Sequence, residues 1–204
     1  MTEVAPELTQ ESIVDATLRL IQRVGLEAVT MRSLAEELGV SHMASYYHVR
    51  NKDSLLRLVA DFVMRDVVVP GPELGAWPDR LKAVICSMRD ALAPYPGLGP
   101  YMLESDRPGQ SARRIVFEAI AMLTEFGFDS HEATLAFTTV HNWFLGRLDV
   151  ESALSPQRRT QLARAQVVVG APDIPEMGAL RKREIFEYGL DVVVAGIASR
   201  HGVT

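Results

Sequence analysis

One short stretch, HMASYYHVRNK at residues 42–52, gathers side chains that could bind a polyanion. It holds two imidazoles, two adjacent tyrosine hydroxyls and two cations within a few residues. Groups of these kinds hold phosphate oxygens and read base edges in nucleic-acid complexes. The chain as a whole is acidic, with a formal net charge of -5 over 204 residues. This balance excludes a protein that coats nucleic acid through excess positive charge, but it leaves room for a local binding surface.

The elements that must position this stretch are expected to be short helices. Apolar residues recur at helical spacing, and the sustained alternation typical of strands does not occur. Helices are expected over 9–24, over 31–39, over about 41–48 and from residue 52 onward. Residues suited to begin a helix as N-caps precede or open these segments: Thr9, Thr30, Ser41 and Asn51.

Two of these helices are separated only by Gly39, Val40 and Ser41, which is the spacing of a helix-turn-helix motif. In that motif the second helix enters the major groove of DNA with its N-terminal end first. The spacing alone also fits a small three-helix packing unit with an incidental aromatic patch, so it does not decide the function.

The wider pattern resembles the DNA-binding domain of the TetR family of bacterial transcription regulators over roughly residues 10–66. The family pattern G-x-x-x-x-T-x-R-x-L-A-x-x-L-G-V is met from Gly25 to Val40, and Y-x-H-V-x-x-K-x-x-L-L is met from Tyr46 to Leu56. Later segments such as WPDRLKAV, YPGLGPYM and NWFLGRL occur in the order found in the tetracycline-repressor type of C-terminal domain. The resemblance therefore covers nearly the whole chain.

The resemblance implies which residues contact DNA. Residues expected to face bases are Arg32, His42, Met43 and Ala44, and Ser41 opens the same helix. Residues expected to hold phosphates are Thr30, Tyr46, Tyr47, His48 and Lys52. Ser45 departs from the family, which usually has an inward-packing leucine there. The acidic character extends to residues 1–66, so weak background binding is expected to favour specific sites over random duplex.

Beyond a linker rich in proline and glycine at 67–78, the chain again has helical spacing. Helices are expected over 78–93, 97–104, 109–126, 130–153 and 178–200, with a loop over 166–177. The expected fold class is all-α. Residues 1–66 would form the helix-turn-helix DNA-binding domain, including a connecting helix at 52–66, and residues 67–204 a larger helical ligand-binding and dimerisation domain.

The resemblance also implies partners. It indicates a homodimer that binds a palindromic operator in double-stranded DNA and is released by a small organic ligand. Candidates for the ligand pocket are Met88, Tyr95, Tyr101, Met102, Phe117, Met122, His141, Asn142 and Trp143. The stripe expected at the dimer interface is Phe186, Leu190, Val193, Val194 and Ile197, with packing inside its own subunit as the alternative. The position of a metal-assisting glutamate in the tetracycline repressor falls at about Val150, so a tetracycline–magnesium inducer is not expected, nor is any other metal or cofactor.

Other function classes find little support. The sequence has no phosphate-cradling glycine loop, zinc-ligand spacing or nucleophile–base motif, and its single cysteine, Cys86, cannot form an internal disulfide. It also lacks a signal peptide and any apolar run of ~18 residues, so a cytoplasmic protein without a membrane partner is expected. Two alternatives stay open: a DNA-binding regulator without an inducer, acting as an activator or a constitutive repressor, and an enzyme with a helical pocket.

Overall fold

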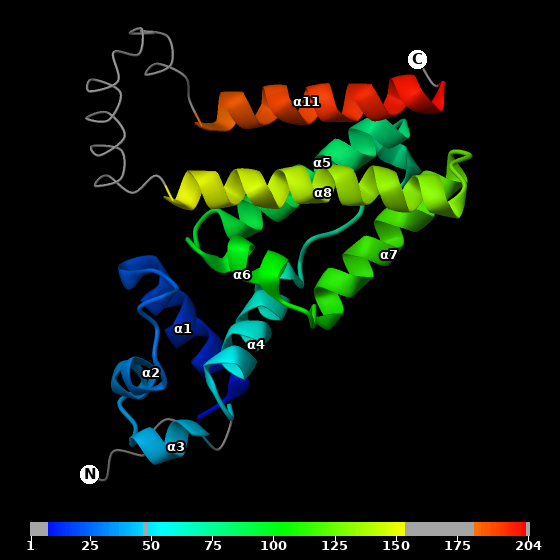
Figure 1. Cartoon of the computed structure of the whole chain (residues 1–204). Coiled ribbons are helices and arrows are strands. Elements are labelled where there is room, and N and C mark those ends of the chain that lie inside the picture. Colours follow the sequence, from blue (N-terminus) through cyan, green and yellow to red (C-terminus); the bar gives the residue numbers. More distant parts are fainter. Residues whose placement is uncertain (1–7, 47–48, 154–181, 203–204) are drawn as a thin grey trace, which may run out of the picture. The chain divides into compact units, whose positions relative to one another are not determined.

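The computed structural model describes residues 8–46, 49–153 and 182–202, and every regular element in these ranges is helical (Figure 1). The all-α fold expected from the spacing of apolar residues is therefore confirmed. The described residues pack as two compact units. One combines residues within 1–67 with 90–115, and the other combines 68–89 with residues within 116–204. The domain division after residue 66 stays a prediction, and the packing joins 90–115 to the N-terminal helices.

Four helices open the first unit: α1 (Gln10–Val24), α2 (Met31–Leu38), α3 (His42–Tyr46) and α4 (Lys52–Met64). Helix α2 packs on α1 and on α3, and α1 packs on α4 (Figure 1). Their shared core is made of fully buried aliphatic side chains, among them Ile13, Ile21, Leu34, Leu55 and Val59. Each such side chain stabilises the fold by roughly 1.5–3 kcal/mol relative to an exposed one. This core holds the short α3 through its contact with α2.

Helices α1, α2 and α4 begin with the same reciprocal cap. In each, the N-cap side chain accepts a hydrogen bond from the backbone N–H three residues later, where a serine hydroxyl accepts one from the N-cap N–H. The pairs are Thr9 with Ser12, Thr30 with Ser33, and Asn51 with Ser54. Because this arrangement satisfies two otherwise unpaired N–H groups, it defines where each helix begins. The N-caps expected at these threonines and at Asn51 are confirmed.

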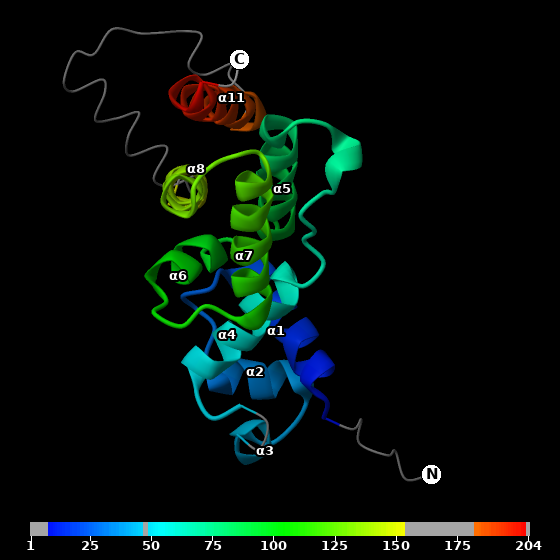
Figure 2. The same cartoon turned by 90° about the vertical axis from the view of Figure 1, so that its right-hand side faces the viewer.

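The remaining elements are η1 (Pro72–Leu74), α5 (Trp77–Leu92), α6 (Leu98–Glu104), α7 (Gln110–Glu125), α8 (Ser130–Ala153) and α11 (Lys182–His201). Helix α6, the end of α5 from Asp90 and the part of α7 up to Ile115 belong to the first unit, and the rest belongs to the second. Helices α8 and α11 lie side by side and run antiparallel (Figures 1 and 2). Large buried side chains fill the second unit, including Trp77, Phe137, Phe144 and Phe186.

The expected helix ends differ from the observed ones by a few residues. Helix α5 begins at Trp77 and not at Pro78, since proline is tolerated in the first turn, where its missing N–H needs no partner. The expected linker contains the short 3-10 turn η1. Helix α11 extends to His201, while the expected loop over 166–177 and the start of that helix at 178 lie outside the described residues.

Two properties of the described residues concern membranes and metal ions. Crossing a membrane requires a long apolar helix, and none of the described helices meets that requirement. Within the same residues, no three His, Cys, Asp or Glu side chains are grouped so that they could hold a metal ion.

Candidate functional site

The turn between α2 and α3 sets the direction of α3. Gly39 adopts a left-handed conformation with φ 67°, and its N–H donates to the carbonyls that end α2. The next N–H, of Val40, donates to Ala35 O at 3.0 Å. Ser41 then caps α3, because its Oγ accepts from Ala44 N at 3.2 Å. Left-handed backbone is unfavourable for residues with a Cβ, so this sharp turn depends on the glycine.

The first turn of α3 presents the residues expected to read bases. Ser41, His42 and Met43 are exposed and Ala44 is half-buried. Met43 stands out because 73% of an apolar side chain is left in contact with solvent. An exposed methionine beside an imidazole could contact a thymine methyl group and a base-edge acceptor. Tyr46 ends α3 as described, and the expected phosphate contacts Tyr47 and His48 lie outside the described residues.

Thr30 and Arg32 lie at the start of α2. The Thr30 hydroxyl accepts from Ser33 N at 3.0 Å, so it is already used as a helix cap, although the residue is exposed. Arg32 points its Nε at Glu36 Oε1, 3.0 Å away, in a pair with side-chain exposures of 83% and 66%. Such exposed pairs are weak, so Arg32 could exchange this carboxylate for DNA at little cost.

Lys52 is the first residue of α4. Its ammonium donates to Glu27 O at 2.9 Å, and the residue is half-buried. A lysine ammonium carries three N–H donors, so two stay available for a phosphate after this bond is made. The contact with the loop before α2 therefore orients Lys52 without consuming it.

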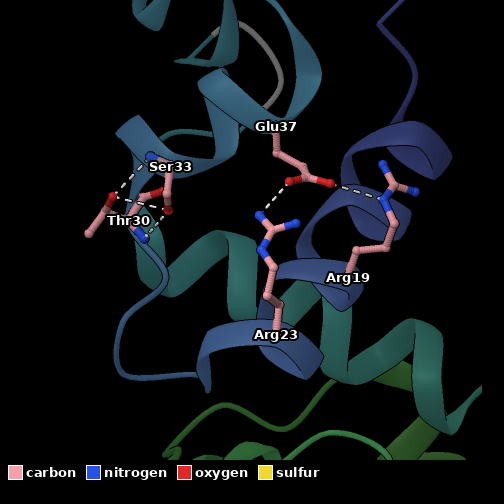
Figure 3. A network of polar contacts seen from close by, with 5 residues as sticks. All are labelled: Arg19, Arg23, Thr30, Ser33 and Glu37. Carbon is pink, nitrogen blue, oxygen red and sulfur yellow. Dashed lines mark hydrogen bonds and ion pairs between the residues drawn. The ribbon is translucent and has the colours of Figure 1, made fainter.

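The side chain of Glu37, in α2, forms ion pairs with two arginines of α1 (Figure 3). Its two carboxylate oxygens accept from Arg19 Nε at 3.1 Å and from Arg23 Nη2 at 2.6 Å. These hydrogen bonds, that from Arg23 first, hold the pKa of Glu37 below its usual 4.5. The cluster ties the helix that precedes the turn to α1. Sequence reasoning missed it, since Glu37 lies 18 residues from Arg19.

The pocket candidates of the second unit are spread over its helices. Met88 and Met122 are buried in the core, Phe117 is exposed, and Trp143 stacks on Phe186 with ring centroids 5.6 Å apart. His141 stacks on Phe137, and burial lowers the pKa of His141 despite an opposing hydrogen bond with Asn142. This histidine is therefore neutral at pH 7, which suits a group facing an uncharged environment.

The candidates of the first unit are Tyr95, Tyr101 and Met102, all half-buried. Tyr101 and Met102 line a cavity of about 30 Å³ together with α4 and the start of α7. This volume is far below the roughly 300–1,000 Å³ of ligand pockets. Tyr101 is used as a hydrogen-bond donor, with its hydroxyl 3.0 Å from Asp53 Oδ1.

The stripe expected at the dimer interface is divided by the packing. Phe186, Leu190 and Val194 are buried within the chain itself, which was the alternative, so they leave almost no surface for a partner. Val193 and Ile197 are half-buried. The physical reason is that α11 carries apolar residues on both of its faces, and α5 and α8 cover the face with the phenylalanine.

Exposed apolar side chains lie on the opposite face of α11 and on the adjoining face of α8. On α11, Tyr188 and Val192 are 74% and 54% exposed, and on α8 Leu135 is 54% exposed. A cavity of about 430 Å³ opens between the two helices. Its lining includes Leu135, Thr139, Val192, Gly196, Ile197 and Arg200. Sequence reasoning could have found this surface from the spacing of Ile185, Tyr188 and Val192 along one side of the helix.

Both halves of the chain match known protein families. Residues 13–59 match bacterial regulatory proteins, tetR family, and residues 69–201 match the tetracyclin repressor-like, C-terminal domain. The first match contains the turn, α3 and most of α4, and the second contains α5 to α11. The resemblance seen in residues 10–66 and in the later segments is thereby confirmed.

Individual relatives are transcriptional regulators. An HTH-type transcriptional regulator of Saccharopolyspora erythraea is 29% identical, over 97% of this chain and 88% of that protein. The class A tetracycline repressor from transposon 1721, in Escherichia coli, is 30% identical, over 95% and 92%. The solved structure of the Streptomyces coelicolor TetR family protein ActR in complex with actinorhodin is similar with a TM-score of 0.78 and 25% identity, over 95% of this chain and 97% of that one.

Proposed function

This chain belongs to the tetR family of bacterial regulatory proteins, and we propose that it is a homodimeric repressor that binds a palindromic operator and is released by a small organic ligand. The observation that carries the proposal is the exposed first turn of α3. It follows a glycine-dependent turn at the end of α2, and Thr30 and Arg32 at the start of α2 are exposed as well. A helix presented in this way can enter the major groove with its N-terminal end.

Two classes of DNA contact are proposed. Arg32, His42, Met43 and Ala44 face bases and so determine sequence preference. A second group holds the sugar-phosphate backbone of DNA and so determines the position of the protein on the duplex. Its members are Thr30, Ser41, Tyr46, Tyr47, His48 and Lys52. The exposure of Ser41, His42 and Met43 supports these roles, as does the remaining hydrogen-bonding capacity of Lys52.

A homodimer is supported by the exposed apolar side chains of α8 and α11. Exposed apolar residues are rarely grouped on one face of a monomeric protein unless a partner covers them. Tyr188 and Val192 lie on the side of α11 that faces away from its own core, with Gly196 next to them on the wall of the 430 Å³ cavity. A two-fold dimer that binds a palindromic operator must present its two recognition helices about 34 Å apart, which is one turn of DNA.

Release by a small organic ligand is supported by the relative solved with actinorhodin. The proposed ligand contacts in this chain are the candidates inside the second unit, Met88, Met122 and Trp143, with His141 and Asn142 as the polar pair. A neutral His141 can both donate and accept a hydrogen bond, which suits a phenolic or carbonyl group of such a ligand. The ligand must bind one arrangement of the protein better than the other, because equal affinity shifts no equilibrium.

The experiment that tests this proposal is selection of bound duplexes from a random library with the purified protein. Two inverted half-sites about one DNA turn apart are the expected result. A single half-site would refute the dimeric reader, and no enrichment at low salt would refute the DNA-binding role of α3. Displacement of the selected operator by polycyclic aromatic compounds, measured by fluorescence anisotropy, then tests the ligand. An operator complex that none of them affects would favour the regulator without an inducer.

A further inference from the structure

Helices α4 and α7 cap each other. Asp61, in α4, accepts a hydrogen bond on Oδ1 from Ser111 N in the first turn of α7, at 2.6 Å. Arg114, in α7, donates from Nη2 to Arg65 O at 3.1 Å and to Val67 O at 2.7 Å, just beyond the end of α4. Each charge has the sign that the neighbouring helix end favours, a carboxylate at an N-terminus and a guanidinium at a C-terminus. The two contacts therefore reinforce one another.

The close approach behind this reciprocal cap depends on Gly109. A Cβ on residue 109 would collide with Asp61 Oδ1 and would lie 2.9 Å from both Cβ and Cγ of Asp61. The obstacle thus includes atoms near the backbone of α4 and not only the far end of a side chain. Only a glycine lets the residue before α7 come this near to α4.

A third contact holds the other end of α4. The Tyr101 hydroxyl of α6 donates to Asp53 O at 3.1 Å and to Asp53 Oδ1 at 3.0 Å. Burial and the neighbouring Asp53 raise the pKa of Tyr101 to about 12, so it remains a donor at any physiological pH. Helix α4, which is about 20 Å long at 1.5 Å per residue, is therefore held near both ends and in its second half.

We propose that Asp61, Gly109 and Arg114 are positioning residues: their reciprocal cap sets the orientation of α4 and thereby the separation of the two recognition helices in the dimer. This inference rests on the proposed function, because only a dimer has two recognition helices whose separation can be set. None of the three belongs to the expected DNA contacts. A tilt of about 10° would displace one end of a 20 Å helix by about 3.5 Å, roughly one base-pair step. Loss of the cap should therefore blur the spacing that the dimer accepts, without changing the bases that it reads.

The test is a selection in which the half-site is the one enriched by the wild-type protein and only the spacer between half-sites varies. The wild-type protein should prefer one spacer length by about tenfold or more over spacers one base pair longer or shorter. Asp61→Ala and Arg114→Gln should reduce this preference to within about threefold, with an unchanged half-site sequence. Asp61→Asn keeps an acceptor for Ser111 N, so its spacer preference should lie between that of the wild-type protein and that of Asp61→Ala.

Matched controls come from the same elements. Arg113→Gln changes the exposed arginine next to Arg114, and Asp106→Asn removes an exposed carboxylate shortly before α7. Both should keep the wild-type spacer preference. Thermal unfolding of each variant verifies folding, and Arg114→Gln carries the test if Asp61→Ala does not fold.

The possible outcomes separate the two proposals. Folded variants that keep the wild-type spacer preference would overturn the positioning role while leaving the dimeric reader intact. A changed half-site sequence would overturn it as well, because the residues would then act on base reading. If the wild-type protein enriches no paired half-sites, the proposed function itself fails and this inference falls with it.

Discussion

Glu36→Gln tests whether the carboxylate of Glu36, next to the expected DNA contact Arg32, weakens the binding of DNA. Glu36 Oε1 lies 3.0 Å from Arg32 Nε, one helical turn away, and both side chains are mostly exposed. An exposed pair with this spacing stabilises a helix by only about 0.3–0.5 kcal/mol. The substitution should therefore leave the stability of the fold almost unchanged.

The effect on DNA binding should be larger than the effect on stability. A carboxylate about 5 Å from a phosphate is repelled by roughly 0.8 kcal/mol in water, and Arg32 would no longer have to leave a partner worth about 0.4 kcal/mol. Together these terms predict binding about eightfold tighter at low salt. The repulsion acts on every duplex, because every duplex carries phosphates, so random DNA should gain about fourfold. The term from Arg32 adds to this only where Arg32 contacts a base, so the full gain of about eightfold is expected for the operator.

Fluorescence anisotropy with the selected operator and with a scrambled duplex, at about 50 and 200 mM salt, measures both affinities. The matched control is Asp66→Asn, which removes the same charge beyond the far end of α4. That position is about 20 Å along the helix from Lys52, more than twice the Debye length of about 8 Å at physiological salt. If Glu36→Gln binds no more tightly than Asp66→Asn, or gains affinity only for the operator, the Glu36 carboxylate does not weaken DNA binding by repelling phosphates.

Five further substitutions test the DNA contacts, the stability of the fold and the dimer interface. His42→Ala should alter base preference in a selection, whereas Lys52→Ala should weaken binding to every duplex and make the salt slope shallower by about one; similar effects on preference would refute the sorting of contacts. Glu37→Gln should lower the melting temperature at neutral pH, and its difference from the wild-type protein should shrink as the pH falls below 4.5, because a carboxyl whose pKa is lowered in the folded state stabilises the fold above 4.5 and loses this effect as the pH falls through the lowered value; a difference that does not change over this range would contradict this. Gly39→Ala should destabilise the fold by about 1–2 kcal/mol in chemical denaturation, since φ is 67° but nothing lies within 4 Å of the added Cβ, so a much larger loss would point to a clash. Tyr188→Glu should give a folded monomer in light scattering, and a dimer of unchanged stability would exclude the exposed face of α11 as the interface.

The helices α1 to α4 could be predicted from the sequence because the features that define them join residues close together in the chain. The caps at Thr9, Thr30 and Asn51 each join residues three apart, and the turn needs only Gly39 in a left-handed conformation. Side chains and backbone groups this close in the chain meet whenever the helix forms, so residue types and spacing are sufficient. The exposure of Met43 on α3 follows from the same pattern.

Helix α11 marks where sequence reasoning stops. Its two apolar sides, one with Phe186 and Leu190 and the other with Tyr188 and Val192, look alike in the sequence. A helix with apolar residues on two of its sides does not reveal which side its own chain covers. The packing of α5 and α8 decided that question, and it left the side with Tyr188 exposed.

The sequence by itself determined the all-α fold, the places where the N-terminal helices begin and the composition of the reading turn. Only the tertiary structure decided the pairings across long separations, such as Asp61 with Ser111, 50 residues apart, and Glu37 with Arg19, 18 residues apart. The physical reason is that a helix period specifies which residues share a face, while the partner of that face depends on how separate helices pack.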